Sequence, residues 1–203
     1  MSPQGRVLPF SQACENNKTA ILEKLSDIFA DRKTVLEFGS GTGQHATWFA
    51  QAMPWLNWQP TDIASNLPAL FPRCAAYTGS NLLAAEPLDV TRRPWPVPVP
   101  SAVYTANSLH IMSFAAVQDL FKAMGEMAEN DTVLVVYGPF NYGGTYTSDS
   151  NARFDQWLYQ QHPLSAIRDF ERVDELANNA GFAIEADHAM PANNRLLVWR
   201  KSA

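Results

Sequence analysis

Val35-Leu36-Glu37-Phe38-Gly39-Ser40-Gly41-Thr42-Gly43-Gln44 is the stretch of sequence that decides the fold prediction. Residues 34–38 are β-branched and apolar, and the run has the length of a buried strand. The three glycines at every second position then permit positive φ angles and a close approach of the backbone to a ligand. The amide groups that open the next helix would face that ligand. The stretch therefore predicts a strand, a nucleotide-binding loop and a helix N-terminus.

Glu37 is a carboxylate inside this otherwise apolar strand. Burying an unpaired carboxylate costs several kcal/mol, so we expect the side chain to have a partner. A hydroxyl or ammonium group of the ligand is one candidate for that partner.

Strand and helix patterns alternate along the rest of the chain. Helices are predicted over residues 17–30, 44–53, 67–76 and 169–180, after a cap at Ser113, and from Ser150 onward. Strands are predicted over residues 34–38, 55–61, 85–88, 102–106, 132–137, 183–189 and 195–200, the last two as a closing hairpin. The prolines of residues 93–101 indicate an extended connector. This order predicts an α/β fold with a Rossmann-like sheet, mostly parallel with one antiparallel terminal strand, and helices on both faces.

Composition limits the classes of function. A chain of 203 residues with 46% hydrophobic residues is expected to form one domain: an N-terminal extension and helix (1–30), a cofactor-binding core (34–137) and a substrate-side region (138–203). Its net charge of −5 disfavours a nucleic-acid partner. Two cysteines and four scattered histidines predict neither a disulfide framework nor a metal site. Because the sequence shows neither an apolar run of membrane-spanning length nor a secretory signal, we expect no membrane association and a cytoplasmic location.

Polar residues follow four of the predicted strands. In an open α/β sheet the ligand binds beyond the carboxyl ends of the strands. The first strand leads into the glycine loop, and the second ends at Asp62, an acid placed to accept hydrogen bonds from ribose hydroxyls. The third leads to Asp89-Val90, and the fourth to Asn107 and His110. These groups are therefore expected to share one crevice.

The glycine spacing is G-x-G-x-G, which differs from the G-x-G-x-x-G fingerprint of nicotinamide-binding proteins. Together with Glu37, it resembles motif I of class I S-adenosylmethionine-dependent methyltransferases. The resemblance implies S-adenosylmethionine as the cofactor, with its amino-acid end on the glycine loop. It further implies that Asp62 binds the ribose and Asp89 the adenine.

A closer resemblance extends over nearly the whole chain. The matching segments are Glu15-Asn16-Asn17-Lys18, Gly43-Gln44-His45-Ala46, Trp58-Gln59-Pro60-Thr61-Asp62, Leu88-Asp89-Val90-Thr91, Tyr137-Gly138-Pro139-Phe140, Ser150-Asn151, Phe154-Asp155, Arg168-Asp169 and Met190-Pro191-Ala192-Asn193-Asn194. Together they are similar to the methyltransferase-like 26 family, whose substrate is unknown. Two departures stand out: Asn16 occupies a place where arginine is expected, and Ser165-Ala166 occupy a place where Trp-Gly is expected.

Residues and resemblance together give a set of candidate site residues. The cofactor set is Glu37, Gly39, Ser40, Gly41, Gly43, Asp62, Ile63, Asp89, Val90, Asn107, Asn17 and Lys18. The substrate set is Phe140, Tyr142, Asn151, Trp157, Arg168, Asn193 and Asn194, with the loop 138–149 as a lid or substrate wall. His110 and Tyr137 are the candidate general bases. Each has a structural alternative: His110 as a buried structural histidine, the aromatic residues as core, and Asn193 and Asn194 as turn residues.

The predicted function is methyl transfer to a small-molecule acceptor. The Asn/Asp-Pro-Pro-Tyr/Phe motif of many nucleic-acid amino-methyltransferases is missing after the fourth strand, where Ala106-Asn107-Ser108-Leu109-His110 stands instead. Two alternatives remain open: a catalytically inactive module on the same fold that binds the cofactor or a protein partner, and a nicotinamide-dependent oxidoreductase. The sequence leaves the acceptor atom and the oligomeric state open.

Overall fold

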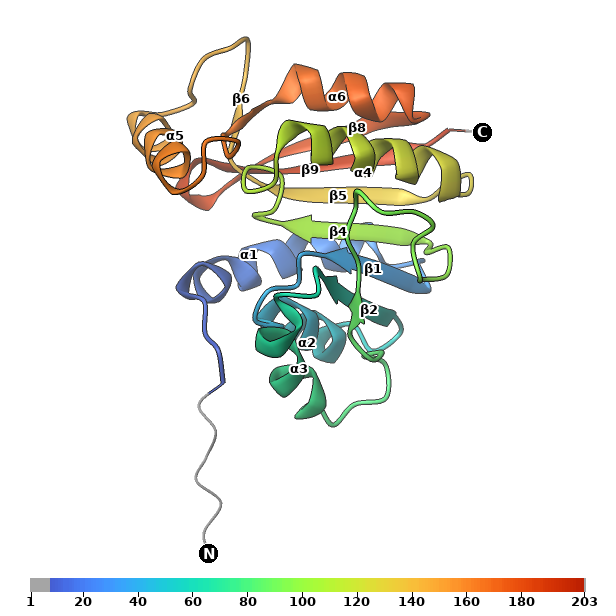
Figure 1. The fold of residues 1–203 in the computed structure, drawn as a ribbon. Helices are drawn as coiled ribbons and strands as arrows, with labels where there is room; N and C mark the ends of the chain where they lie inside the picture. Colours follow the sequence, from blue (N-terminus) through green and yellow to red (C-terminus); the bar gives the residue numbers. More distant parts are fainter. Residues whose placement is uncertain (1–7, 203) are drawn as a thin grey trace, which may run out of the picture.

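The strand that precedes the glycine loop, β1 (Thr34–Phe38), lies near the middle of a seven-stranded sheet. A computed structural model describes residues 8–202. The strand order is β3-β2-β1-β4-β5-β9-β8, so the order reverses between β1 and β4 (Figure 1). The other strands are β2 (Asn57–Asp62), β3 (Glu86–Pro87), β4 (Ala102–Ala106), β5 (Val133–Gly138), β8 (Phe182–Met190) and β9 (Asn194–Lys201).

The sheet is mostly parallel, as predicted. β1 pairs in parallel with β2 and β4, and β4 pairs in parallel with β5. The last strand along the chain, β9, is antiparallel to both of its neighbours. It lies between β5 and β8, one place in from the edge of the sheet, because the closing hairpin inserts its second strand against β5.

Helices cover both faces of the sheet because neighbouring strand residues point to opposite sides. Val35 packs in the core beneath α1 (Gln12–Ile28) and α2 (Gln44–Ala52), and α3 (Leu67–Ala75) lies beside α2. Leu36 packs in the second core, beneath α4 (Phe114–Met127) and α6 (Phe170–Asn179). Figure 1 shows α4 and α6 side by side over that face. Burial on both faces explains why the central strands read as continuous apolar runs.

The structure corrects three element predictions. Helix α1 begins at Gln12, five residues before the predicted start, since the Ser11 side chain caps it and its first turns are polar. Helix α5 (Asp149–Gln161) is capped by Ser148, whose hydroxyl accepts a hydrogen bond from the Asn151 amide, and not by Ser150. The predicted loop 138–149 contains a short strand, β6 (Phe140–Asn141), which pairs in parallel with β7 (Arg168–Asp169).

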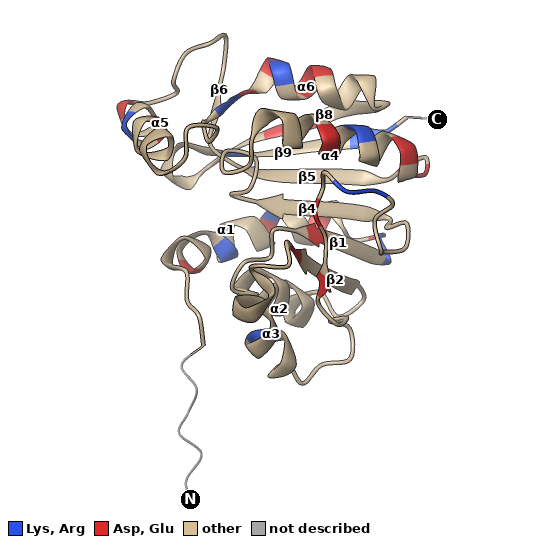
Figure 2. Cartoon of the chain, viewed as in Figure 1, with Lys and Arg blue, Asp and Glu red and all other residues tan. Residues whose placement is uncertain are grey.

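Charged residues of both signs are interspersed over the elements. Figure 2 shows Lys and Arg on α1, α3, α4 and α6, with Asp and Glu on several of the same helices. Within residues 8–202, no helix has both the length and the apolar character that crossing a membrane requires.

Candidate functional site

The glycine loop leaves β1 with three left-handed residues: φ is +65° at Gly39, +56° at Gly41 and +73° at Gly43. The Ser40 amide donates to the Thr61 carbonyl at 2.9 Å, which ties the loop to β2. At Gly39 a Cβ atom would lie 2.5 Å from the Ser108 hydroxyl oxygen. The loop is therefore held between the end of β2 and the turn after β4, with glycine required by both angle and space.

The partner of Glu37 belongs to the protein itself. Its carboxylate is 2% exposed and accepts a hydrogen bond from the Trp58 indole Nε1 at 2.8 Å. Burial raises the pKa of Glu37 to about 7, the negative charge of Asp62 adds to the increase, and the Trp58 hydrogen bond opposes it. Glu37 is thus a buried acid directly below the glycine loop that titrates near neutral pH.

Asp62, at the end of β2, holds the glycine loop through its carboxylate. One oxygen accepts from the Gly41 amide at 2.8 Å, and the other accepts from the Ile63 amide at 2.8 Å and from the Asn66 side-chain amide at 2.9 Å. A carboxylate offers about four acceptor positions, so one remains for a ribose hydroxyl. The expectation that both ribose hydroxyls bind here would require one internal bond to be displaced.

The ends of β2 and β3 lie side by side, since Asp62 is paired with Pro87 in the parallel register. Asp89 follows β3 and accepts hydrogen bonds from the Thr91 amide and hydroxyl at 3.0 and 2.7 Å. Ile63 is 45% exposed and Val90 is partly buried. This edge therefore combines two carboxylates with apolar side chains, a combination that fits a ribose and a purine ring.

Asn107 and His110 lie together at the end of β4. Asn107 has a φ of +56°, and its amide donates to the Tyr137 carbonyl at 2.8 Å. A Cβ atom on Gly138 would lie 3.6 Å from His110 Nδ1 and 4.0 Å from the Asn107 side-chain oxygen. The ends of β4 and β5 thus bring these two side chains to one place.

His110 is buried and neutral at physiological pH. Its side chain is 5% exposed, and burial lowers its pKa to about 4, with the positive charge of Arg168 adding to the decrease. Among the residues that the structure describes, no hydrogen bond involves the imidazole ring. A neutral imidazole retains one nitrogen lone pair, so His110 can accept a proton, but its lowered pKa makes it a weaker base than an exposed histidine.

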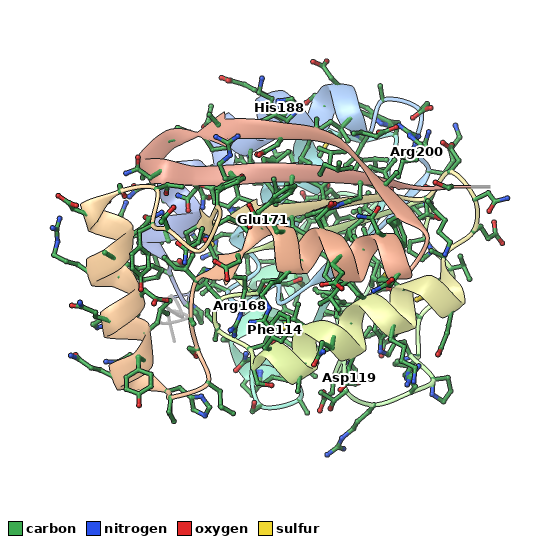
Figure 3. The ribbon with its side chains drawn as sticks, turned by 90° about the horizontal axis from the view of Figure 1, so that it is seen from above. Phe114, Asp119, Arg168, Glu171, His188 and Arg200 are labelled. Atoms are coloured by element: carbon green, nitrogen blue, oxygen red, sulfur yellow. The ribbon has the colours of Figure 1, made fainter. Side chains whose placement is uncertain are left out.

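Arg168 supports the turn that carries His110. Its guanidinium donates to the carbonyl oxygens of Leu109 at 3.0 Å, Met112 at 2.5 Å and Leu164 at 3.0 Å. Figure 3 places it beside Phe114, and its guanidinium carbon lies 5.8 Å from the centre of that ring. Most of its donors are therefore committed to the main chain, although it stands in the predicted substrate set.

Helix α1 meets the glycine loop through its polar first turns. The Asn17 side-chain oxygen lies 2.7 Å from His45 Nε2 at the start of α2. Lys18 forms an ion pair with Glu15 and lies over the Trp48 ring at 4.2 Å. Both predicted cofactor residues of α1 thus make contacts that dock the helix on α2.

Tyr137 lies between α1 and the β8–β9 turn. Burial raises the pKa of its phenol, while the nearby polar side chains of Asn17 and Asn194 act in the opposite direction. The phenol therefore keeps its proton at neutral pH, and Tyr137 has the character of a hydrogen-bond donor. Of the two candidate bases, His110 alone has the required protonation state.

The predicted substrate residues divide into core, anchor and surface positions. Phe140 is 1% exposed and belongs to the core beneath α4 and α6. Tyr142 donates to Asp187 at 2.7 Å, and Asn151 donates to the Asn193 carbonyl at 3.2 Å. Trp157 is 51% exposed.

Further contacts fix the segment between β5 and α5. The Asn193 side chain donates to the Ser150 hydroxyl at 3.2 Å, and the Asn194 side chain donates to the Pro191 carbonyl at 3.1 Å. The Gly143 amide donates to Glu171 at 2.9 Å. The Gly143 contact attaches the segment to α6, and the Tyr142–Asp187 hydrogen bond attaches it to β8. The Asn193 contact joins the β8–β9 turn to α5, and the Asn194 contact lies within that turn. The two attachments of the segment favour a wall over a lid.

Two hollows lie away from these residues. One, of about 510 Å³, lies between α4 and α6, and the other, of about 460 Å³, runs along α5. Neither is lined by a residue of the predicted cofactor set. We place the candidate site at the open carboxyl edge of the sheet, because the loop geometry and the acidic residues lie there. Within the described part of the chain, no group of three or more His, Cys, Asp or Glu side chains is placed to hold a metal ion.

Several residues at this edge were not predicted from the sequence. They are Ser108, which contacts Gly39; Arg73, which donates to the Thr42 carbonyl; Gln44, which joins α1 to α2; and Phe154, which contacts His110. Gln44 lies within the quoted loop, so its place was visible. The other three depend on packing between distant segments.

Comparison with known proteins assigns the family. A family model described as a protein of unknown function, DUF938, matches residues 8–201. The chain belongs to the DUF938 family. This DUF938 protein therefore carries the candidate site within a sequence that matches the family almost from end to end.

The DUF938 chain shares its fold with solved methyltransferase structures. An O-methyltransferase family protein from Burkholderia thailandensis superposes with a TM-score of 0.80 at 14% identity, covering 92% of this chain and 56% of that chain. The O-methyltransferase NcsB1 from neocarzinostatin biosynthesis, in complex with S-adenosylmethionine and 2-hydroxy-5-methyl naphthoic acid, gives 0.75 at 18% identity, covering 93% and 54%. Human N-acetylserotonin methyltransferase, in complex with S-adenosylmethionine, gives 0.72 at 12% identity, covering 97% and 61%.

These structural similarities bear on the fold of the chain. At such identities they show a common fold, the class I methyltransferase type with a Rossmann-like sheet. The DUF938 chain spans little more than half the length of these proteins. The predicted fold class is confirmed.

Proposed function

We propose that this DUF938 protein is an S-adenosylmethionine-dependent methyltransferase that acts on a small-molecule acceptor. The observation that carries the proposal is the glycine loop, which has three left-handed residues and lies at the point where the strand order reverses. The Gly41 amide of this loop donates a hydrogen bond to the Asp62 carboxylate at 2.8 Å. The fold that it shares with methyltransferases solved in complex with this cofactor supports the proposal. We include in this proposal the closer relationship to the methyltransferase-like 26 family that the sequence resemblance implies.

The predicted cofactor residues fit the chemistry of S-adenosylmethionine. Asp62 retains an acceptor position for a ribose hydroxyl, while Asp89, Ile63 and Val90 provide a carboxylate and apolar surface for adenine. Glu37 places a titrating acid below the loop that would hold the cationic end of the ligand. When bound, the cofactor supplies an electrophilic methyl group on a sulfonium.

The chain's own contribution to such a reaction is to orient the acceptor and to take its proton. His110, neutral and without a hydrogen-bond partner on its ring among the described residues, is the proposed base. Tyr137, which keeps its proton, is proposed to orient the acceptor as a donor. Arg168 holds the His110 turn in position through three carbonyl groups.

Two other functions compete with this proposal. A module that binds the cofactor or a partner without catalysis would use the same fold, but it would have no need of a neutral histidine at the end of β4 whose ring has no hydrogen bond among the described residues. A nicotinamide-dependent oxidoreductase would be expected to have G-x-G-x-x-G spacing, and the G-x-G-x-G sequence argues against it.

Calorimetry with S-adenosylmethionine and S-adenosylhomocysteine tests the cofactor. We expect binding to the wild-type protein, and a loss of roughly tenfold or more in affinity for Asp62→Ala, which removes the acceptor of the Gly41 amide as well as the ribose partner. Asp119→Ala, which removes a carboxylate on α4, is the matched control and should bind normally. Binding of NADH in preference to both ligands would contradict the proposal.

A further inference from the structure

We propose that the flank of α5 carrying Phe154 and Trp157 binds the methyl acceptor, and that the acceptor is a planar aromatic molecule bearing a hydroxyl group. The position given to the acceptor rests on the proposed function. The chemical class rests on the side chains of this flank and of the turn that it faces.

An aromatic row leads from the candidate base to the surface. The Phe154 ring meets the His110 ring edge to face, with centroids 5.4 Å apart and planes at 73°. One helical turn further, Trp157 stacks on Phe154 with centroids 5.7 Å apart and planes at 14°. The row ends in an indole that is 51% exposed. A planar ring lying against this row would have one edge near His110.

The turn that carries His110 adds apolar surface. Ile111 is 60% exposed, and its carbonyl accepts a hydrogen bond from the Ser165 hydroxyl at 2.6 Å. The Ala166 amide donates to the His110 carbonyl at 3.0 Å, so the segment before β7 fixes the turn. A single exposed apolar side chain is ordinary on a protein surface. Here two large exposed apolar side chains, Ile111 and Trp157, lie on either side of the buried, neutral His110 at the carboxyl edge, and this arrangement favours an apolar ligand.

Several of the charged groups around this flank are already partnered. Arg168 donates to main-chain carbonyls, and Asp155 accepts from the Tyr146 hydroxyl at 2.7 Å and from the Ile167 amide at 2.5 Å. Across the segment 138–149, Arg195 is paired with Asp187 at 2.7 Å. Arg153, four positions before Trp157 on α5, has no ion pair among those of the described residues, so the charges at this flank do not decide between a charged and an uncharged acceptor.

A hydroxyl group completes the chemistry of the inferred acceptor. Its oxygen gives its proton to the His110 imidazole and forms a bond to the methyl carbon, while the carbon–sulfur bond breaks and its electron pair stays on sulfur. No further reactant is needed, and each proton and electron pair has a destination.

The opposite flank of α5 provides a matched control. Tyr159 is 65% exposed and lines the hollow of about 460 Å³ together with Gln156, Gln160 and Pro163. This flank is also aromatic and accessible, but within the described part of the chain no aromatic contact joins it to the His110 ring. Ser165 and Ala166, which fix the His110 turn, line the same hollow. Tyr159→Ala nevertheless removes an exposed aromatic side chain that, among the described residues, stacks on neither Phe154 nor Trp157.

The test uses the full chain saturated with S-adenosylhomocysteine and titrated calorimetrically with 2-naphthol. We expect the wild-type protein and Tyr159→Ala to bind it alike. We expect Trp157→Ala to bind it about three- to tenfold more weakly, and Trp157→Phe to retain most of the affinity. Decahydro-2-naphthol, which is not planar, should bind at least about threefold more weakly than 2-naphthol.

Equal binding of 2-naphthol by wild type and Trp157→Ala would overturn the inference, as would an absence of binding to wild type. The proposed function fails separately, if S-adenosylhomocysteine does not bind. In that case the same titrations on the cofactor-free protein still report whether the α5 flank binds planar rings, so the two failures are distinguishable.

Discussion

Gly39 satisfies two demands that no other residue meets together. Its φ of +65° is a left-handed angle, and a Cβ atom at this position would lie 2.5 Å from the Ser108 hydroxyl oxygen. Ser108 in turn donates to the Ala106 carbonyl at 3.1 Å, so the hydroxyl cannot move without breaking a bond at the end of β4. The backbone path from β1 into the loop therefore depends on this glycine.

Gly39→Ala is predicted to lose stability and cofactor affinity together, while Gly143→Ala loses stability alone. Gly143 has a similar φ of +57° but nothing within 4 Å of a Cβ atom. Gly143→Ala should reduce the free energy of unfolding by about 1–2 kcal/mol, the cost of a left-handed alanine. Gly39→Ala should reduce the free energy of unfolding by more than this, and it should bind S-adenosylhomocysteine more weakly than the wild-type protein. Denaturant titration measures the first effect and calorimetry the second. Equal effects of the two variants would contradict the role given to Ser108.

His110→Gln is predicted to lower methyl transfer by about 10²- to 10⁴-fold without changing the affinity for S-adenosylhomocysteine. The measurement is transfer of labelled methyl into a metabolite extract. Because burial lowers the pKa of His110 to about 4, wild-type turnover should not fall between pH 7 and 5 through protonation of this base. Tyr137→Phe should have the smaller effect, since it removes only a donor. Unchanged turnover in His110→Gln would remove the proposed base.

The sequence predicted which residues lie at the carboxyl edge better than what each one contacts. Glu37 was expected to require a partner because a lone buried carboxylate is unfavourable. Its partner, the Trp58 indole, lies on the neighbouring strand, and only the register of β1 against β2 brings the two together. Arg168 likewise stands in the substrate set predicted from the sequence, but its donors reach carbonyl groups of a turn far away along the chain.

At the scale of elements, α1 is the helix whose position depends most on polar contacts with the loop. The Gln44 side chain accepts from the Ser11 amide at 2.5 Å, at the start of α1. Arg73 of α3 donates to the Thr42 carbonyl at 3.0 Å and to the Pro9 carbonyl at 2.7 Å. The segment before α1 and the glycine loop are therefore held by the same side chains.

Arg73→Ala is predicted to loosen the start of α1 and to weaken cofactor binding several-fold. The variant removes the donor shared by Pro9 and Thr42, so amide exchange over residues 9–17 should accelerate while the central strands stay protected. Hydrogen exchange and calorimetry with S-adenosylhomocysteine would measure both effects. Lys122→Ala on α4 is the control, because that side chain is exposed and belongs to neither predicted site set. Faster exchange in the central strands as well would indicate general destabilisation.

Elements with strong periodic patterns were predicted well, and short ones were not. β1 and β4 have the predicted bounds, because continuous apolar runs identify strands buried on both faces. β6 and β7 have two residues each and carry no detectable period. The first turns of α1 are polar where they meet α2 and the loop, so the apolar stripe alone placed the start of the helix too late.

At the scale of the whole molecule, three buried titrating groups oppose one another. Burial lowers the pKa of His45 and of His110 to about 4, from an ordinary value of 6.5. Burial raises the pKa of Glu37 to about 7, from 4.5. Between pH 7 and 5 the unfolded chain binds more protons at the histidines, so acidification destabilises the fold through them. In the same range the folded chain binds more protons at Glu37, so acidification stabilises the fold through that residue.

The balance predicts the sign and size of the pH dependence. From pH 7 to 5 the two histidines should remove about 3–4 kcal/mol of unfolding free energy and Glu37 should return about 2 kcal/mol, leaving a net loss of about 1–2 kcal/mol. Glu37→Gln removes the stabilisation that proton uptake by Glu37 provides on acidification. The free energy of unfolding of this variant should therefore fall about twice as steeply as that of the wild-type protein between pH 7 and 5, whatever its value at pH 7. His45→Gln should flatten the profile instead. Urea unfolding at a series of pH values measures all three slopes, and parallel profiles for wild type and Glu37→Gln would show that Glu37 does not take up its proton in this range.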